Sequence, residues 1–302
     1  MVISVIICTY NRSASLRRTL ASMEASARPG DGCELIIVDN NSTDDTRQVA
    51  TGFLNTSGIN GAYVFEGLQG LSHARNAGIR AATGDVLAFT DDDVTVHPNW
   101  LASLRDAFLR QDCAAVGGRI VPVWTCPKPS WLVQEGPYQL AKVIVSFDLG
   151  DAPCPLKCAP FGANMAFRKT LFEKYGVFRP DLGRSGSNLM GCEETEFSKR
   201  LLEAGEPFVY EPRAIVYHPV EAQRLEKRYF QSWYFNYGVA RVKINGLSQT
   251  LAAAGTALLK NIVKWMITFE SRRRFFHKLQ IYLMVGELLE SYRMSRGSVR
   301  RS

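Results

Sequence analysis

The sequence lacks both of the glycine-rich signatures through which many proteins hold nucleotide phosphates on main-chain amides. No GxGxxG follows the first predicted strand, at residues 2–8, and no Walker A sequence occurs among the 302 residues. These absences argue against a dinucleotide-binding Rossmann domain and against a P-loop NTPase. Any nucleotide that binds this chain must therefore be held by side chains and not by a glycine-rich loop.

Long hydrophobic runs and paired cysteines are also scarce. No stretch of about 18 uncharged apolar residues occurs, so we expect no membrane-spanning helix. The opening residues, MVISVIICTY, read as a strand that ends in a loop, not as a signal peptide. The seven cysteines are scattered and odd in number, which favours buried thiols in a reducing cytosol over a disulfide framework. Cys154 and Cys158 have no second Cys or His pair at zinc spacing, which argues against a zinc site.

Charge is divided unevenly along the chain. Residues 221–302 contain 15 Lys and Arg against 5 Glu, a net charge of +10, whereas the whole chain carries +7. Residues 1–220 consequently carry a net charge of −3. This asymmetry predicts two parts with different tasks, a mildly acidic globular body and a basic C-terminal attachment.

Apolar, β-branched segments alternate with helical segments in the first part of the chain. Residues 2–8 and 34–38 are predicted buried strands, and helices are expected at about 14–27 and 43–54. This alternation predicts an α/β fold with parallel strands joined by right-handed crossovers. Ligands of such sheets bind beyond the carboxyl ends of the strands, so those strand ends are the first places to search for a site.

Three consecutive aspartates, Asp91, Asp92 and Asp93, follow the apolar run at residues 86–90. Their carboxylates repel one another unless a cation lies among them, and a hard divalent cation shared with a substrate phosphate is the usual solution. The alternative is a strand-end turn in which one Asp caps the next helix. Polar clusters at residues 9–12 and 39–41 fall at the same predicted sheet edge, which favours a binding site over turn chemistry alone.

Further candidate residues occur at later helix starts and after a strand. Arg75 lies early in a short helix, where it could reach a phosphate, although a solvated basic face is the alternative. Glu193 and Glu194 open another helix, a place that the helix dipole alone favours for acids. His218 follows a predicted strand pair at residues 207–217, and it matters for function only if it returns to the same sheet edge.

Taken together, five motifs resemble those of the inverting nucleotide-sugar glycosyltransferases of family 2. The motifs are CTYNR at 8–12, VDNNSTDDT at 38–46, GLSHARNAGIRAATGD at 70–85, FTDDDV at 89–94 and GCEETEF at 191–197. Each motif alone is modest, but their order and spacing make the resemblance specific. It implies a GT-A (Rossmann-like) fold, with a mixed, mostly parallel sheet sandwiched by helices. The catalytic domain would span residues 1–220, followed by a helical extension at 221–302.

The resemblance also implies roles for individual residues. Donor binding would involve Thr9, Tyr10, Arg12, Asp39, Arg75, Asp91, Asp92 and Asn164. Asp93 and His218 would ligate Mn²⁺ or Mg²⁺, with Asp91 and Asp93 forming the DxD motif; a register that uses the first two acids keeps Asp92 as an alternative. Glu194 would be the catalytic base, and Glu193 is the alternative because this chain has Glu where many members have Asp.

The implied reaction is metal-dependent transfer of a hexose, with inversion, from a nucleoside-diphosphate sugar to a hydroxyl group. The acceptor would be a glycan or a lipid-linked molecule in polysaccharide or glycoconjugate biosynthesis. The alternative is a non-catalytic, membrane-attached scaffold that binds sugar nucleotides on the same fold. Such a scaffold has no need for the intact acids and His218, so their presence argues against it.

The basic C-terminal part has its own pattern. Apolar helices are expected at residues 250–269 and 275–289, with Lys260 and Lys264 on one face of the first. Basic helices with Trp and Phe suit an anionic membrane surface, which predicts a cytoplasmic protein peripheral at the inner membrane face. The alternative is a helical cap that packs on the core or forms a homo-oligomer. We expect no nucleic-acid binding, because nothing in the acidic body supports it.

Overall fold

The computed structural model describes residues 1–26, 32–186, 188–246 and 251–299, and the chain forms two compact units. Unit 1 comprises Met1–Val123, Val145–Gly186 and Glu193–Pro219. Unit 2 comprises Trp124–Ile144, Ser187–Cys192 and Val220–Ser302. The chain enters unit 2 for the last time at Val220, but the earlier segment Trp124–Ile144 also belongs there. These units are defined by compactness, so the expected division into two functional domains after residue 220 stays a prediction.

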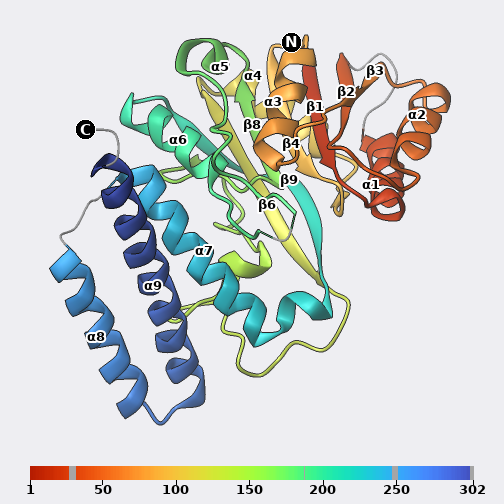
Figure 1. Ribbon diagram of the computed structural model, residues 1–302. Helices are drawn as coiled ribbons and strands as arrows, with labels where there is room; N and C mark the ends of the chain where they lie inside the picture. Colours follow the sequence, from red (N-terminus) through yellow and green to blue (C-terminus); the bar gives the residue numbers. More distant parts are fainter. Residues whose placement is uncertain (27–31, 187, 247–250, 300–302) are drawn as a thin grey trace. The chain divides into compact units, whose positions relative to one another are not determined.

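Unit 1 begins with a parallel series of strands and helices (Figure 1). The elements are β1 (Ile3–Thr9), α1 (Ser13–Ser26), β2 (Cys33–Asp39), α2 (Thr46–Thr56), β3 (Gly61–Phe65), α3 (Leu71–Ala81) and β4 (Val86–Asp91). β1 pairs in parallel with both β2 and β4, and β2 pairs in parallel with β3. The structure thereby confirms the parallel strands that the alternation predicts.

The sheet continues with strands of mixed direction. These strands are β5 (Thr95–Val96), β6 (Ala115–Trp124), β7 (Cys154–Pro155), β8 (Asn164–Arg168) and β9 (Phe208–Val220). Within the described residues the order is β3-β2-β1-β4-β8-β6-β9-β5, with β7 paired to β9, and β8 is antiparallel to β4 and β6. The expected strand pair at residues 207–217 is wrong, because β9 is one continuous strand. Its sequence contains no Gly, Asn or Asp that could form a hairpin turn.

Both faces of the sheet are covered by helices. Successive residues of β1 alternate between the two faces, so that Val5 and Ile7 join one core and Ile6 joins the other. Side chains of α1, α2 and α4 (Trp100–Arg110) complete the first core. Side chains of α3, α5 (Thr170–Tyr175) and α6 (Glu193–Glu203) complete the second. Burial on both faces explains why the strands are apolar throughout.

Unit 2 is mainly helical. Its elements are η1 (Ala141–Ile144), η2 (Ala222–Leu225), α7 (Lys227–Asn245), α8 (Leu251–Ile267) and α9 (Ser271–Val299). α9 packs along both α7 and α8 (Figure 1). The Trp131 ring contacts the rings of Phe230 and Phe275 edge-on, with ring centroids 5.0 Å apart in each pair. Segment 124–144 therefore shares the core of the helices. No helix in the described part of the chain is long and apolar enough to cross a membrane.

Candidate active site

The carboxyl ends of three parallel strands form one rim of the sheet. In the strand register Cys8 lies opposite Asp91 and Thr9 lies opposite Asp39. The main-chain N–H of Asn40 donates to the carbonyl of Thr9 at 2.9 Å, which continues the pairing beyond the strands. The three polar clusters that follow β1, β2 and β4 therefore meet at one edge, as the sequence predicts.

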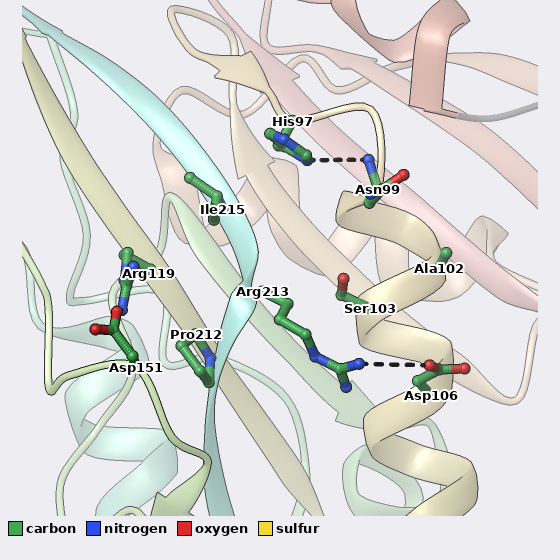
Figure 2. A pocket seen from close by; sticks show the side chains of 10 residues that line it. All are labelled: His97, Asn99, Ala102, Ser103, Asp106, Arg119, Asp151, Pro212, Arg213 and Ile215. Atoms are coloured by element: carbon green, nitrogen blue, oxygen red, sulfur yellow. Dashed lines mark hydrogen bonds and ion pairs between the residues drawn. The ribbon is translucent and has the colours of Figure 1, made fainter.

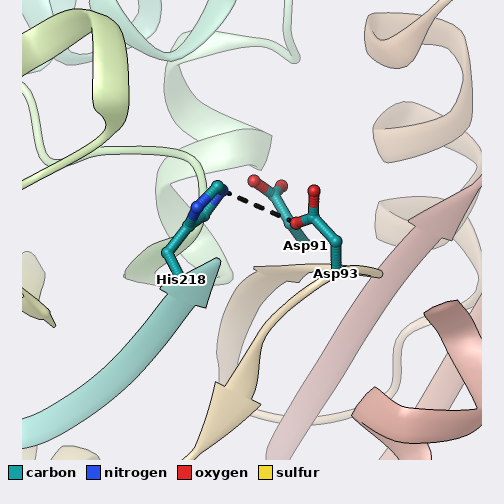
Figure 3. Close-up of side chains that lie close together, drawn as sticks. All are labelled: Asp91, Asp93 and His218. Atoms are coloured by element: carbon teal, nitrogen blue, oxygen red, sulfur yellow. Dashed lines mark ion pairs between the residues drawn. The ribbon is translucent and has the colours of Figure 1, made fainter. Parts of the chain in front are cut away.

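Asp91, Asp93 and His218 converge at this rim (Figure 3). One ligand atom from each residue lies within 4.8 Å of the others. His218 projects from β9 and is 1% exposed, with Nε2 at 3.6 Å from Asp93 Oδ1. Its Nδ1 lies 3.0 Å from the carbonyl oxygen of Pro219. A proton on Nδ1 would donate to that carbonyl and leave the Nε2 lone pair directed at Asp93, as in many metal-ligating histidines. Two carboxylates and an imidazole fit a divalent cation.

Arg12 supplies positive charge to the same acids. Its Nη1 donates to Asp92 Oδ1 and to Asp93 Oδ2, each at 3.0 Å. Asp92 is almost completely buried, and burial together with the Asp93 charge raises its pKa to about 7, although Arg12 opposes the shift. The three aspartates are therefore not equivalent. Asp91 keeps the most accessible carboxylate, whereas Arg12 holds the other two.

Arg75 joins the end of β4 to the start of α6. Arg75 is 3% exposed, and its guanidinium forms an ion pair with the buried Glu193 and lies 3.8 Å from Asp91 Oδ1. The centroid of the Phe178 ring lies 5.8 Å from this guanidinium, and a Cβ on residue 162 would collide with it, so any residue other than glycine there would displace the guanidinium. Sequence reasoning missed this ion pair because its partners are 118 residues apart. In this structure Arg75 is a buried link, and its predicted contact with the diphosphate stays a prediction.

Glu193 and Glu194 have different surroundings at the start of α6. Glu193 is buried in the ion pair with Arg75, whereas Glu194 remains partly accessible. Although the residue keeps some accessible surface, the protein around its carboxyl group excludes much of the water, and this desolvation together with the charge of Glu193 raises the pKa of Glu194 to about 8, against the opposing effect of Arg75. Glu194 can therefore gain and lose a proton near neutral pH, while Glu193 is held as a counter-ion.

The donor-binding residues expected at the ends of β1 and β2 differ in accessibility. Tyr10 is 40% exposed, whereas Thr9 and Asp39 are buried. Asp39 accepts hydrogen bonds from the Tyr63 hydroxyl and from the Ser42 main-chain N–H, both at 2.8 Å. Of Thr9, Tyr10 and Asp39, Tyr10 thus presents the most side-chain surface to a ligand. Asp39 mainly shapes the loop that follows β2.

Asn164 lies at the start of β8 and is completely buried. Its amide group donates to the carbonyls of Arg119 at 2.9 Å and Ala214 at 2.8 Å, and accepts from Trp100 Nε1 at 2.8 Å. These bonds join β8 to β6, β9 and α4. A contact between this side chain and a donor sugar, as predicted, would require some of them to break.

A separate pocket of about 450 Å³ lies in unit 1 between α4 and β9 (Figure 2). Arg213 Nη1 lies 3.8 Å from Asp106 Oδ2, and Arg119 Nη2 lies 2.7 Å from Asp151 Oδ1. The two arginines that line this pocket are therefore already paired with carboxylates, and the pocket offers little attraction for an anionic nucleotide. Neither the converging trio nor Glu194 lines it, so the rim is the better candidate for the reaction.

The families and proteins that this chain resembles agree with the resemblance seen in its motifs. The sequence model of the family Glycosyl transferase family 2 matches residues 4–176. The chain is similar to glucosyl-dolichyl phosphate glucuronosyltransferase of Haloferax volcanii, with 29% identity over 230 residues, covering 75% of this chain and 72% of that protein. It is also similar to succinoglycan biosynthesis protein ExoM of Rhizobium meliloti, with 29% identity over 263 residues, covering 84% and 80% of the two chains.

A solved structure resembles this one over most of its length. It is the mannosyltransferase PcManGT from Pyrobaculum calidifontis in complex with GDP-Man and Mn²⁺, with a TM-score of 0.63 and 18% identity. The match covers 96% of this chain and 86% of that one. At this level of identity the likeness concerns the fold, and it confirms the GT-A arrangement of a mixed sheet between helices.

Proposed function

The chain belongs to glycosyltransferase family 2, and we propose that it transfers a sugar from a nucleoside-diphosphate donor to a hydroxyl group of a glycan or lipid-linked acceptor. The observation that carries this proposal is that a candidate metal site and a candidate catalytic base lie at one rim. The candidate metal site is the trio of Asp91, Asp93 and His218, and the candidate base is Glu194 at the start of α6. Arg75 links them through Asp91 and Glu193. A scaffold that only bound sugar nucleotides would not need both.

Asp91, Asp93 and His218 would hold a divalent cation, and we propose Mn²⁺ or Mg²⁺. The related mannosyltransferase structure contains Mn²⁺, which supports this choice. When bound, such a cation neutralises the negative charge that develops on the departing diphosphate. Arg12, with its guanidinium partly exposed beside Asp92 and Asp93, would contribute additional positive charge on the protein side.

Glu194 would act as the catalytic base. In its deprotonated form it accepts the proton of the acceptor hydroxyl while that oxygen bonds to the anomeric carbon. The bond from this carbon to the diphosphate oxygen breaks in the same step, and the single displacement inverts the anomeric centre. Glu193 is the weaker candidate because it is buried and its carboxylate is paired with Arg75.

Donor recognition would involve the remaining rim residues. Tyr10 is the exposed aromatic side chain at the end of β1, and we assign it to the nucleotide base. Thr9, Arg12 and Asp39 would complete this base-binding site, whereas Asp92 and Arg75 would shape the rim mainly through their buried contacts. For Asn164 we propose a supporting role, since its amide already joins three elements.

A lipid-linked acceptor at the inner face of a membrane is the acceptor we favour. The Haloferax relative is named for a reaction on glucosyl-dolichyl phosphate, and the Rhizobium relative for succinoglycan biosynthesis. These names place similar chains in the assembly of lipid-linked glycans or polysaccharides. A hexosyl donor and a peripheral position at the cytoplasmic face of the membrane would suit that task.

A panel of nucleotide sugars tests the proposal. Each donor is mixed with the protein and Mn²⁺ or Mg²⁺, and the thermal unfolding midpoint and release of nucleoside diphosphate are measured. We expect one donor class to raise the midpoint and to be slowly hydrolysed, with both effects lost in EDTA. Stabilisation by a donor, without turnover under any metal or with any lipid or glycan acceptor, would support the scaffold alternative instead.

A further inference from the structure

Unit 2 exposes an apolar surface at the turn between α8 and α9. We call this surface the α8–α9 tip and define it by its exposed apolar and basic side chains. The apolar members are Leu259, Val263, Met266, Ile267 and Phe269, and the basic members are Lys260, Lys264, Arg272, Arg273 and Arg274. Phe269 is 97% exposed, and Met266 and Ile267 are each 65% exposed. A contiguous group of large apolar side chains is seldom left in water without a partner.

The apolar members lie on one side of α8. Leu259, Val263, Met266 and Ile267 have the i, i+4, i+7 and i+8 spacing that aligns side chains along one helix face. Lys260 and Lys264 follow the first two by one position each, so they border this face. No side chain of α8 described by the structure is fully buried. Packing on α9 therefore leaves a second, apolar face of α8 uncovered.

The tip differs from unit 1 in the clustering of its exposed apolar side chains. Its apolar members are 47–97% exposed, against 36–46% for the exposed apolar side chains of α9, which are Val285, Leu289, Tyr292 and Met294. Large exposed apolar side chains in unit 1, such as Leu109 and Leu149, occur singly or in pairs on different elements. At the tip, five occur within residues 259–269. Isolated exposed apolar residues are normal on protein surfaces, whereas a contiguous group beside cations marks an interaction surface.

The charges of the tip select among its candidate partners. Residues 259–274 contain five Lys and Arg and one Glu, and Glu270 is already paired with Arg273 at 2.6 Å. A second copy docked on the same face around a two-fold axis would bring these cations together, which disfavours a homodimer. The guanidinium carbon of Arg274 lies 5.3 Å from the centroid of the Trp265 ring, so an amphipathic aromatic side chain lies beside the cations of the tip. Apolar side chains next to cations and Trp match the boundary of an anionic bilayer.

We propose that the α8–α9 tip docks on an anionic lipid bilayer. Phe269, Met266 and Ile267 insert among the acyl chains near the headgroups, and the surrounding Lys and Arg side chains contact lipid phosphates. The helix lies on the surface and does not cross it, in agreement with the absence of a spanning helix in the described residues. This surface is distinct from the transfer chemistry, so its test requires no turnover.

Vesicle flotation of the full chain tests the proposal. Vesicles of phosphatidylcholine alone are compared with vesicles that also contain phosphatidylglycerol, for the native protein and for the triple variant M266S/I267S/F269S. We expect the native protein to float with the anionic vesicles and the variant to bind them at least about tenfold more weakly. The control is L109S/L149S, which removes exposed apolar side chains elsewhere and should float like the native protein.

A second variant addresses the cations without changing the apolar residues. K264E/R272E should lose about tenfold or more in affinity for anionic vesicles, and added salt should weaken native binding. Thermal unfolding of every variant checks that it is folded. Equal flotation of native protein and both tip variants would overturn the proposal. So would a native protein that ignores vesicles but dimerises in sedimentation through the same residues.

Discussion

Charged side chains are used in opposite ways at the rim of unit 1 and at the α8–α9 tip of unit 2. At the rim, Arg75, Glu193 and Asp92 are buried and bound to one another or to neighbours of opposite charge. At the tip, the Lys and Arg side chains are exposed, and so are the large apolar residues between them. Burying charges costs several kcal/mol per ion before pairing, so a protein that retains such a group commonly uses it for chemistry. Exposed cations beside exposed apolar groups instead prepare a surface for a partner.

The largest effect is expected at the rim, from Asp93→Ala. We expect kcat to fall by about a thousandfold or more, because the cation would lose one of its carboxylate ligands. Initial rates at saturating Mn²⁺ and direct Mn²⁺ binding by calorimetry measure the two consequences. The control is Asp112→Ala, which changes an exposed aspartate outside the rim. An Asp93→Ala protein with near-native rates and metal affinity would separate the trio from the reaction.

The next effect separates the two glutamates of α6. Glu194→Gln should lower kcat by about a hundredfold or more and leave donor affinity nearly unchanged, because it removes the base. Glu193→Gln should instead lower the free energy of unfolding by about 3 kcal/mol, because Arg75 would become a buried charge without its counter-ion. Steady-state kinetics and chemical denaturation distinguish them. If Glu193→Gln lost turnover without losing stability, while Glu194→Gln kept full activity, the base would be Glu193.

The pH dependence should be smaller but characteristic. Burial and Glu193 raise the pKa of Glu194 to about 8, and a base acts in its deprotonated form. The value of kcat/KM should thus rise about tenfold per pH unit below that pKa and level off above it. The same shift makes the folded state bind the proton more tightly, so the free energy of unfolding should fall as pH rises from about 4.5 to about 8. A native profile identical to that of Glu194→Gln would contradict this assignment.

The smallest effect on stability is expected at the tip. Phe269→Ser should change the free energy of unfolding by no more than about 0.5 kcal/mol, because the ring is almost completely exposed. Phe230→Ser, in the core of the same unit, should lower it by about 3 kcal/mol or more. Denaturant unfolding of both variants makes the comparison. A large loss from Phe269→Ser would show that this ring packs on the protein and is not available to a membrane.

Much of the rim could be predicted because its residues adjoin easily recognised strands. The apolar runs before Thr9, Asp39 and Asp91 mark buried strands, and the parallel alternation predicts that their ends meet. Other features depended on pairings between distant segments. The ion pair of Arg75 with Glu193 joins two helices with no local sign of their contact, and β9 was expected to turn where it continues straight.

The sequence by itself determined the class of fold, the family and the residues at the strand ends, because hydrophobic periodicity and short motifs are local properties. Only the tertiary structure decided which of these side chains remain accessible. Tyr10 and Glu194 keep accessible surface, whereas Asn164 and Arg75 are taken up by bonds to other elements. It also grouped segment 124–144 with the C-terminal helices and left the α8–α9 tip uncovered. Burial and ion pairing depend on which distant segments come together, and residue order along the chain does not specify that directly.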